Sequence, residues 1–503
     1  MKRLFKKLVT TNVSTMYVFI LLGISTLMMA GYFSYAWFTV QGVQKYSVVT
    51  GNLYGTVAIG TNSVTIAGQG VLTYTPTTDS DTITLTVTNT NDRTVKNSIY
   101  YYNLSDSTIQ IGYTSNSPTI PSTTGISVNQ NKTLTYKIKI KNAKGKQIKI
   151  GSSIGLNNSN LTLPSGTTAF SLLSEPSASE TLIAKANPET LDYNNATTDQ
   201  KNQMWTFTHE ATEQLAATTD YRYIGANPNN YVKFNDELWR IIGVFDVDDG
   251  TGKIEKRMKI IRNESIGEYS WDNKDTSTGA EDDYGKNNWP DARLNYLLNP
   301  GHESETYGGS LYWNRKSGTC YYGQNNATTS CDFTSTGLTD AAKSMIGDAK
   351  WYLGGTSNYT SLSNGLVSHW YKYERGTTVY SGRSTNWTGK VGLMYPSDYG
   401  YATSGGSRKN RASCMTKELY KWANYRDYCD CPYNDWLYNS SQNQWTITPR
   451  ATYSSNVFRF PASGDVEDSA TSNPLAVRPV VHLKSTINII SGTGSSTNPF
   501  VLS

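Results

Sequence analysis

Residues 82–88 read TITLTVT, and residues 134–140 read LTYKIKI. In both stretches an apolar side chain occupies every second position. Because successive side chains of a strand point to opposite faces, each stretch has one buried and one solvated face, as in antiparallel sheets. Asparagine-containing turns at 89–92 and 129–131 bound these runs. Residues 48–175 are therefore predicted to form an immunoglobulin-like or jelly-roll β-sandwich.

The composition agrees with a β-rich globular chain. Its 503 residues have room for about two or three domains. Charged residues make up 17% of the chain, and 36 tyrosines and 12 tryptophans supply apolar area that a disordered chain lacks. Threonine and tyrosine also favour pleated, half-buried surfaces. We expect a mainly β protein.

The net charge of +5 comes largely from the N-terminus, where Lys2, Arg3, Lys6 and Lys7 stand close together. The rest of the chain is close to neutral. No basic stripe remains that could follow a phosphate backbone, so nucleic-acid binding is not expected.

An uncharged stretch follows this basic cluster. Residues 16–36 read MYVFILLGISTLMMAGYFSYA, about the 20 residues that a helix needs to span a bilayer. Because the closely flanking basic residues precede it, residues 1–12 are predicted to be a cytoplasmic tail, residues 13–38 a transmembrane helix or signal anchor, and the residues after about 38 extracellular. The protein is thus predicted to be a single-pass protein of the cell membrane.

Whether this segment is cleaved stays open, because Ser34-Tyr35-Ala36 is a small-x-small site behind an unusually long apolar region. Residues 34–39, SYAWFT, resemble the exit signal of camelysin-like biofilm-matrix proteins. That resemblance implies trimming by a dedicated signal peptidase.

The region 48–175 contains no histidine or cysteine, so it has little from which to build a catalytic site. We interpret it as a spacer. Its resemblance to the fibre-forming domain of biofilm-matrix proteins leaves assembly through edge strands as an alternative. Residues 176–215 have little periodicity and are predicted to be a linker with at most one short helix.

The distal region, 216–503, is predicted to be an α+β domain. An Asp-Gly turn at 249–250 joins the apolar runs 238–245 and 257–261, which predicts a hairpin. A calcium loop beginning at Asp246 is disfavoured, because its twelfth position holds Arg257 where a bidentate glutamate is needed. Short helices are predicted over 291–298 and after Thr339, which can act as an N-cap.

Seven motifs of this region occur in a recognisable order. They are YVKFN at 231–235, LWRIIG at 238–243, WDN at 271–273, GLMYPSDYGYA at 392–402, WTITP at 445–449, VRPVVHL at 477–483, and an ending from GTG at 492–494 to NPFVL at 498–502. Together they resemble a C-terminal domain of unknown function in membrane-anchored surface proteins of Gram-positive gut bacteria. The VRP element is distantly similar to the close of the formylglycine-generating-enzyme branch of the C-type lectin fold. This resemblance implies a lectin-like α+β domain over 216–503, and fold analogy alone gives no function.

All the cysteines lie in this region: Cys320, Cys331, Cys414, Cys429 and Cys431. In an exported domain they are disulfide candidates. Cys320 with Cys331 would close a short loop, Cys414 could pair with Cys429 or Cys431, and one thiol is left over. No metal site is predicted, because Cys-x-x-Cys spacing is absent. An oxidase would need Cys429 and Cys431 as a reactive pair, and no common catalytic motif is present. No cofactor is expected.

Aromatic side chains beside hydrogen-bonding groups favour recognition of sugars or peptides. The binding candidates are Tyr395, Asp398, Tyr399, Tyr401, Trp445 and Arg478. The stretch 395–401 is interpreted as a loop or turn. Core packing is the more common use of such aromatics, and Arg478 is interpreted more readily as a residue that bonds loop carbonyls.

The resulting hypothesis is a membrane-anchored bacterial cell-surface protein, non-catalytic, that binds a glycan or a surface protein through its distal domain. Two alternatives remain, a structural or fibre-forming envelope protein and a thiol-dependent oxidase.

Overall fold

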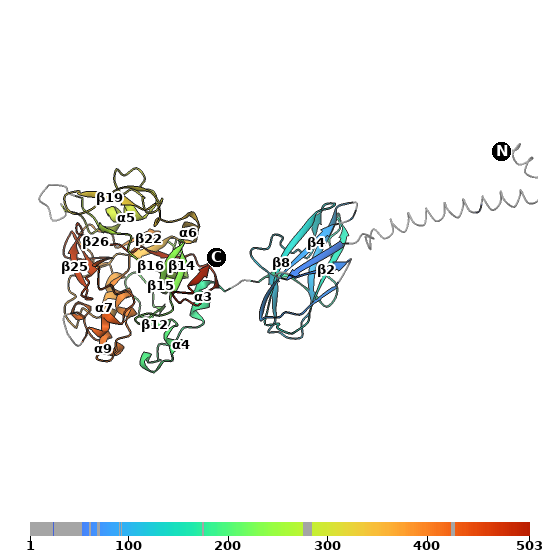
Figure 1. Ribbon diagram of the computed structural model, residues 1–503, viewed down its shortest axis with the longest axis horizontal. Coiled ribbons are helices and arrows are strands. Elements are labelled where there is room, and N and C mark those ends of the chain that lie inside the picture. Colours follow the sequence, from blue (N-terminus) through green and yellow to red (C-terminus); the bar gives the residue numbers. More distant parts are fainter. Residues whose placement is uncertain are drawn as a thin grey trace, which may run out of the picture. The chain divides into compact units, whose positions relative to one another are not determined.

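The protein is built mainly of β-strands and divides into two compact units, Met1–Glu175 and Pro176–Ser503 (Figure 1). The computed structural model describes residues 53–59, 62–67, 71–89, 91, 93–173, 176–274, 284–423 and 428–503, together with Ile24. Each unit has a large hydrophobic core, and these two cores share no residue. Each unit thus holds the apolar contacts that its own folding requires.

No helix within the described ranges is long and apolar enough to cross a lipid bilayer. The predicted tail at 1–12 and the predicted span at 13–38 lie outside the described residues, with Ile24 as the sole exception. The membrane anchor therefore stays a prediction.

The first unit consists of two sheets. Its strands are β1 Leu53–Ile59, β2 Asn62–Ala67, β3 Val71–Tyr74, β4 Ser80–Asn89, β5 Val95–Tyr102, β6 Gln110–Tyr113, β7 Ile126–Val128, β8 Thr133–Lys141, β9 Ile148–Leu156, β10 Thr167–Ala169 and β11 Ser171–Leu172. One sheet has the order β11-β6-β8-β4-β1-β2 and the other β10-β5-β9-β3, with β7 beside β5. Side chains from both sheets meet in one core.

The alternation that the sequence predicts for this unit is confirmed. Strands β4 and β8 pair antiparallel, with Ile83 opposite Ile138 and Leu85 opposite Tyr136, and these side chains are at most 2% exposed. On the other face Thr84 lies opposite Lys137 and is only half-buried. Two sheets around a common core are what a sandwich requires.

Residues 176–215 belong to the second unit, so the prediction that they form a linker is wrong. Helix α3, Ala178–Ile183, begins with a capping box in which Ser177 and Glu180 bind each other's backbone N–H groups. Leu182 of this helix is 4% exposed and packs in the core of the second unit. The polar residues that lowered the hydrophobic periodicity are caps of short helices rather than parts of a solvated spacer.

The second unit contains several sheets. Its strands are β12 Trp205–His209, β13 Thr218–Arg222, β14 Tyr231–Phe234, β15 Glu237–Asp248, β16 Ile254–Arg262, β17 Glu268–Ser270, β18 Ser317–Tyr321, β19 Thr328–Asp332, β20 Ala349–Tyr352, β21 Asn386–Gly389, β22 Val391–Gly392, β23 Gln444–Pro449, β24 Asn456–Phe460, β25 Glu467–Ala470, β26 Pro474–Ala476, β27 Val480–His482, β28 Ile489–Ser491 and β29 Phe500–Leu502. The largest sheet follows the order β22-β27-β16-β15-β14-β29-β28, and β13 joins β12 to β15. A second sheet has the order β17-β26-β23-β24-β25, and β18-β19 and β20-β21 are separate two-stranded sheets.

Short helices connect these strands. They are α3 Ala178–Ile183, α4 Thr198–Lys201, α5 Arg293–Leu298, α6 Asp340–Met345, α7 Val367–Glu374, α8 Pro396–Ala402, α9 Arg411–Met415 and α10 Asp430–Tyr433, with 3-10 turns at Tyr193–Asn195, Trp289–Asp291 and Leu419–Lys421. The predicted hairpin is confirmed, because β15 pairs antiparallel with β16. The predicted cap is confirmed as well: the Thr339 side chain accepts the N–H of Ala342 at the start of α6.

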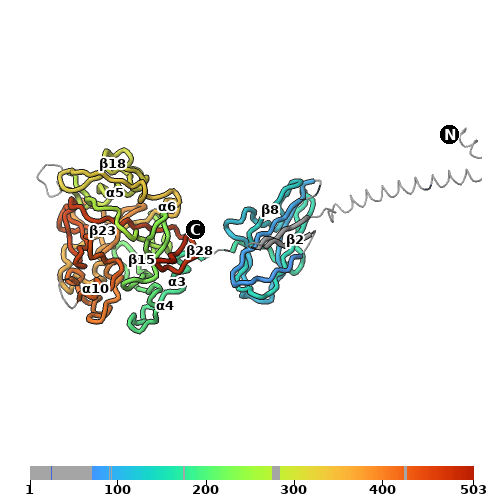
Figure 2. Tube along the Cα trace, in the orientation of Figure 1, coloured from blue at the N-terminus to red at the C-terminus, as the bar shows by residue number. Residues whose placement is uncertain are grey.

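The beginning and the end of the second unit lie side by side. Helix α3 and strand β28 are neighbours in Figure 2, and the N–H of Ala178 donates to the carbonyl of Ile487 across 2.6 Å. This closure places α3 against the last hairpin of the chain, where a groove forms.

Candidate functional site

Strand β13 turns two charged side chains into the interior of the second unit. Its period of two puts Thr218, Asp220 and Arg222 on one face, and all of them are buried. Asp220 lies 2.8 Å from Arg222 Nη2 and 3.2 Å from His209 Nε2. Burial opposes ionisation of Asp220, but Arg222 and His209 outweigh it and lower the pKa of Asp220. Asp220 is therefore a paired carboxylate.

Asp398 continues this network into helix α8. Its Oδ1 accepts a hydrogen bond from Arg222 Nη1 across 3.0 Å, and its Oδ2 accepts one from Lys259 of β16. The same carboxylate accepts the N–H of Tyr395 across 2.9 Å and so caps the helix. Burial opposes ionisation of Asp398, but Lys259 and Arg222 overcome it and lower its pKa. One side chain thus joins β13, β16 and α8.

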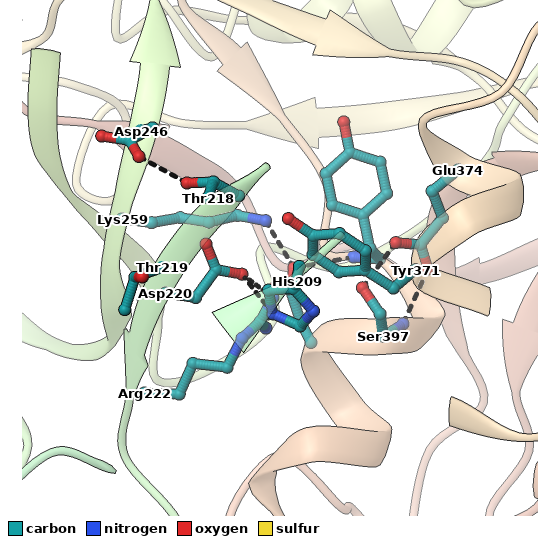
Figure 3. Close-up of polar contacts among 12 residues, drawn as sticks. His209, Thr218, Thr219, Asp220, Arg222, Asp246, Lys259, Tyr371, Glu374 and Ser397 are labelled. Carbon is teal, nitrogen blue, oxygen red and sulfur yellow. Dashed lines mark hydrogen bonds and ion pairs between the residues drawn. The ribbon is translucent and has the colours of Figure 1, made fainter. Parts of the chain in front are cut away.

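A second acid, Glu374, ties the end of α7 to the start of α8. Its Oε1 accepts the N–H of Ser397 across 2.7 Å, and its Oε2 accepts the Ser397 hydroxyl and, across 2.9 Å, Nη1 of Arg375. Figure 3 shows Glu374 and Ser397 facing each other across the two helices. Burial raises the pKa of Glu374 to about 7, although Arg375 opposes this shift. At neutral pH this carboxyl is near the midpoint of its titration.

Tyr371 of α7 lies in a stack of rings and charge. The ring of His209 is parallel to it within 9°, with the centroids 3.7 Å apart, and the guanidinium carbon of Arg375 lies 3.7 Å from its centroid. Burial lowers the pKa of His209, which keeps this imidazole neutral although Asp220 is close. The stack holds Tyr371 in one orientation above the charged groups (Figure 3).

Four residues of this network, Asp220, Lys259, Tyr371 and Arg375, border a pocket of about 30 Å³, which has room for about two water molecules. It reaches solvent beside Leu215, Asp246 and Lys350, whose side chains are partly exposed. A pocket of this size cannot enclose a sugar or a peptide. Over the described ranges, no three His, Cys, Asp or Glu side chains are placed to hold a metal ion.

A larger groove of about 320 Å³ lies between α3, α4 and the β28–β29 hairpin. Its volume is in the range of small-molecule sites. Its lining includes the half-buried amides Asn202, Gln203 and Asn229, whose side chains make no hydrogen bond to any described residue. Phe500 and Ile489 supply apolar surface. The groove therefore offers amide donors and acceptors that no described residue uses, beside the partly buried ring of Phe500, which also packs against the core.

The turn that carries Phe500 requires glycine. Gly492 has φ +95°, and a Cβ there would lie 2.1 Å from the carbonyl oxygen of Pro499. Gly494, at φ +79°, packs against the carbonyl of Asn229, where a Cβ would come within 2.2 Å. These close approaches hold the last hairpin against the loop that contributes Asn229 to the groove.

No protein-family model, curated protein or solved structure matches the chain.

The six binding candidates predicted from the sequence do not line an open cleft. Each is at most 9% exposed: Tyr395, Asp398, Tyr399, Tyr401, Trp445 and Arg478. The stretch 395–401, predicted as a loop or turn, forms helix α8 with Pro396 in its first turn. Tyr399 packs 4.3 Å from Phe460 between ring centroids. The prediction of a surface binding site on these aromatics is wrong, because their rings fill the core.

Two of these candidates have purely internal partners. Arg478 donates to the carbonyl of Arg262 across 2.9 Å and to that of Leu437 across 3.4 Å. These bonds agree with the interpretation of Arg478 as a structural residue that binds loop carbonyls. The indole N–H of Trp445 donates to the carbonyl of Tyr269 across 2.9 Å. Tyr395 alone of the candidate aromatics borders the small charged pocket.

The disulfides resolve the pairing that the sequence left open. Cys320 is bonded to Cys331 across the β18–β19 hairpin, and Cys414 is bonded to Cys431. Cys429 lies outside both bonds and is partly exposed, with Arg408 Nη1 3.7 Å from its sulfur. The reactive pair that the oxidase alternative needs is not formed, because Cys431 is engaged elsewhere.

Sequence reasoning missed both the groove and the charged network. The residues of the network come from strands and helices far apart in the chain; Arg222 and Asp398, for example, are 176 positions apart. One local signal existed, since TTDYR at 218–222 places Asp220 and Arg222 on the same face of a strand. Such an inward-facing charged pair indicates a buried ion-pair partner elsewhere in the fold.

Proposed function

We propose that this chain is a membrane-anchored protein of the bacterial cell surface whose second unit binds a neutral glycan without catalysing a reaction. In this proposal the first unit is an immunoglobulin-like spacer and the second unit a lectin-like domain. The observation that carries the proposal is the groove of α3, α4 and β28–β29, with its unused amides beside Phe500.

The chemistry of the groove favours sugars. An amide both donates and accepts hydrogen bonds, as a sugar hydroxyl does, and Phe500 offers a ring face on which a sugar ring can stack. Lys185 and Asp199 contribute one charge of each sign to the lining. A neutral ligand suits a lining whose charges balance.

Export is supported by two observations. The uncharged stretch 16–36 follows a basic cluster, and two disulfides are formed, which persist in oxidising compartments. The buried carboxylate of Asp398 supports a non-catalytic role, because Arg222 and Lys259 of the fold both bind it.

Glycan binding is tested with the full chain in detergent on an array of neutral and acidic oligosaccharides. We expect neutral glycans to be retained, and the substitutions Q203A and F500A each to lower affinity about tenfold, the loss expected for about one hydrogen bond or stacking contact. I490A is the matched control, because Ile490 is on the same strand as Ile489 but is 61% exposed and outside the groove lining. An array without any neutral ligand, or equal losses in F500A and I490A, would contradict the proposal.

Topology is tested with a membrane-impermeant maleimide on intact cells. Cys429 is the cysteine outside the two disulfides, so we expect it to be labelled without lysis and the other four to react only after reduction. Labelling of Cys429 that requires lysis would place the second unit inside the cell and remove the surface role.

A further inference from the structure

The small charged pocket contains hydrogen-bond donors that the fold does not use. Tyr371, Arg375 and His482 line it and are each at most 6% exposed. The Tyr371 hydroxyl, Arg375 Nε and His482 Nδ1 have no hydrogen-bond partner in the part of the chain that the structure describes. Leaving such groups unpaired in the interior is destabilising, so three of them on residues that line one pocket point to a ligand.

Arg375 determines which chemical group the ligand must present. Its Nη1 donates to Glu374 Oε2 and to the carbonyl of Tyr371, whereas its Nε makes no bond within the described ranges. A guanidinium only donates hydrogen bonds, and its planar fork matches the two oxygens of a carboxylate. The pocket has room for about two water-sized groups, which matches the two oxygens of a carboxylate.

The acids that border the pocket do not fill this role. Asp220 is bound to Arg222 and His209, and Asp246 lies 2.9 Å from Lys256. The cations that balance their negative charges are Arg222 and Lys256, which lie outside the lining. Burial raises the pKa of Glu374 to about 7, so at neutral pH the partner of Arg375 is partly protonated and leaves its positive charge incompletely balanced.

We propose that this pocket binds a carboxylate group, held by Arg375 and by the hydroxyl of Tyr371 with His482 beside them. The carboxylate is either a free acid of one or two carbons or the end of a longer ligand that enters beside Leu215 and Lys350. This site is independent of the groove, and it assigns the second unit a second ligand class.

The experiment uses the full chain in detergent, freed of carboxylate buffers, at pH 7 and constant ionic strength. Acetate binding is followed by saturation-transfer NMR on its methyl signal and by the thermal midpoint of the second unit. Acetamide is the neutral analogue, and sodium chloride is the control for a halide. N-acetylglycine presents a carboxylate at the end of a longer group. We expect acetate, N-acetylglycine or both to bind and to raise the midpoint, and acetamide to do neither.

The variant Y371F removes one donor and keeps the ring that stacks on His209. We expect it to weaken carboxylate binding about tenfold. Y312F is the matched control, because the Tyr312 hydroxyl is equally buried and has no partner within the described ranges, yet it lies outside the pocket. Both variants remove an unpaired hydroxyl, so both are expected to fold at least as stably as the parent.

Binding by acetate alone assigns a small free acid, and binding by N-acetylglycine alone assigns the end of a longer ligand. Equal effects of acetate and acetamide, an equal effect of chloride, or unchanged binding in Y371F would each overturn the proposal. If Y371F did not fold, the comparison of acetate with acetamide on the parent chain would decide alone.

Discussion

Asp398 shows how a single residue can be read in two ways. Its position beside three tyrosines in a tyrosine- and glycine-rich stretch predicts ligand contact, but the structure uses it to neutralise Arg222 and Lys259 and to cap α8. Its side chain is 0% exposed. A buried carboxylate with two cationic partners is costly to remove, because the cations are then left uncompensated.

The substitution D398N is therefore expected to lower the free energy of unfolding of the second unit by about 3–5 kcal/mol. Urea unfolding followed by tryptophan fluorescence measures this change. D340N is the control, since the Asp340 side chain is fully exposed beside Lys343 and its loss should leave stability unchanged. Similar effects of the two substitutions would show that the network does not stabilise the fold.

Glu374 gives a pH dependence whose sign follows from its raised pKa. The pKa rises from 4.5 to about 7 on folding, so between these values the folded state holds a proton that the unfolded state has lost. Its stabilising contribution is complete below pH 4.5 and is lost as the pH rises to about 7, a change of about 3 kcal/mol.

We expect E374Q to lack this change. The difference in unfolding free energy between parent and E374Q, measured by urea titrations from pH 4.5 to 8, should shift against the parent as the pH rises. A difference that is constant across this range would mean that Glu374 titrates normally in the folded state.

At the scale of elements, the segment 176–215 shows how short helices escape a periodicity analysis. Helix α3 has six residues and α4 has four, fewer than two full turns, so no amphipathic repeat can develop. Their ends are nevertheless marked in the sequence, because Ser177 with Glu180 and Thr197 with Gln200 form capping boxes.

Because Leu182 packs in the core, L182A is expected to destabilise the second unit by about 2–5 kcal/mol. If Leu182 lay in a solvated linker, L182A would leave the stability of the second unit almost unchanged. K185A, at an exposed position just after the same helix, serves as control. Thermal unfolding of the three proteins distinguishes a docked helix from a linker.

At the scale of the whole molecule, two cores without a common residue predict two unfolding transitions. I138A removes a fully buried side chain from the first unit and should destabilise that unit by about 2–5 kcal/mol. Differential scanning calorimetry should show one transition moving to lower temperature and the other unchanged. A single transition that moves as a whole would mean that the units unfold together.

Several elements were predictable because their determinants are local in sequence. The alternation at 82–88 and 134–140, the hairpin turn at 249–250 and the cap at Thr339 all act between near neighbours. The pairing of Cys320 with Cys331 spans only eleven positions. Such short separations leave few alternative partners, so the residues themselves specify the local structure.

The candidate sites were decided by the tertiary structure alone. The groove joins residues near 181–203 to residues 489–500, and the small charged pocket joins strands to helices from across the second unit. Whether Tyr399 or Gln203 faces solvent depends on what packs against it after folding, and no short-range pattern carries that information. Composition and periodicity thus determined a mainly β chain with a predicted anchor, whereas the packing of distant elements decided which polar groups are used by the fold and which remain for a ligand.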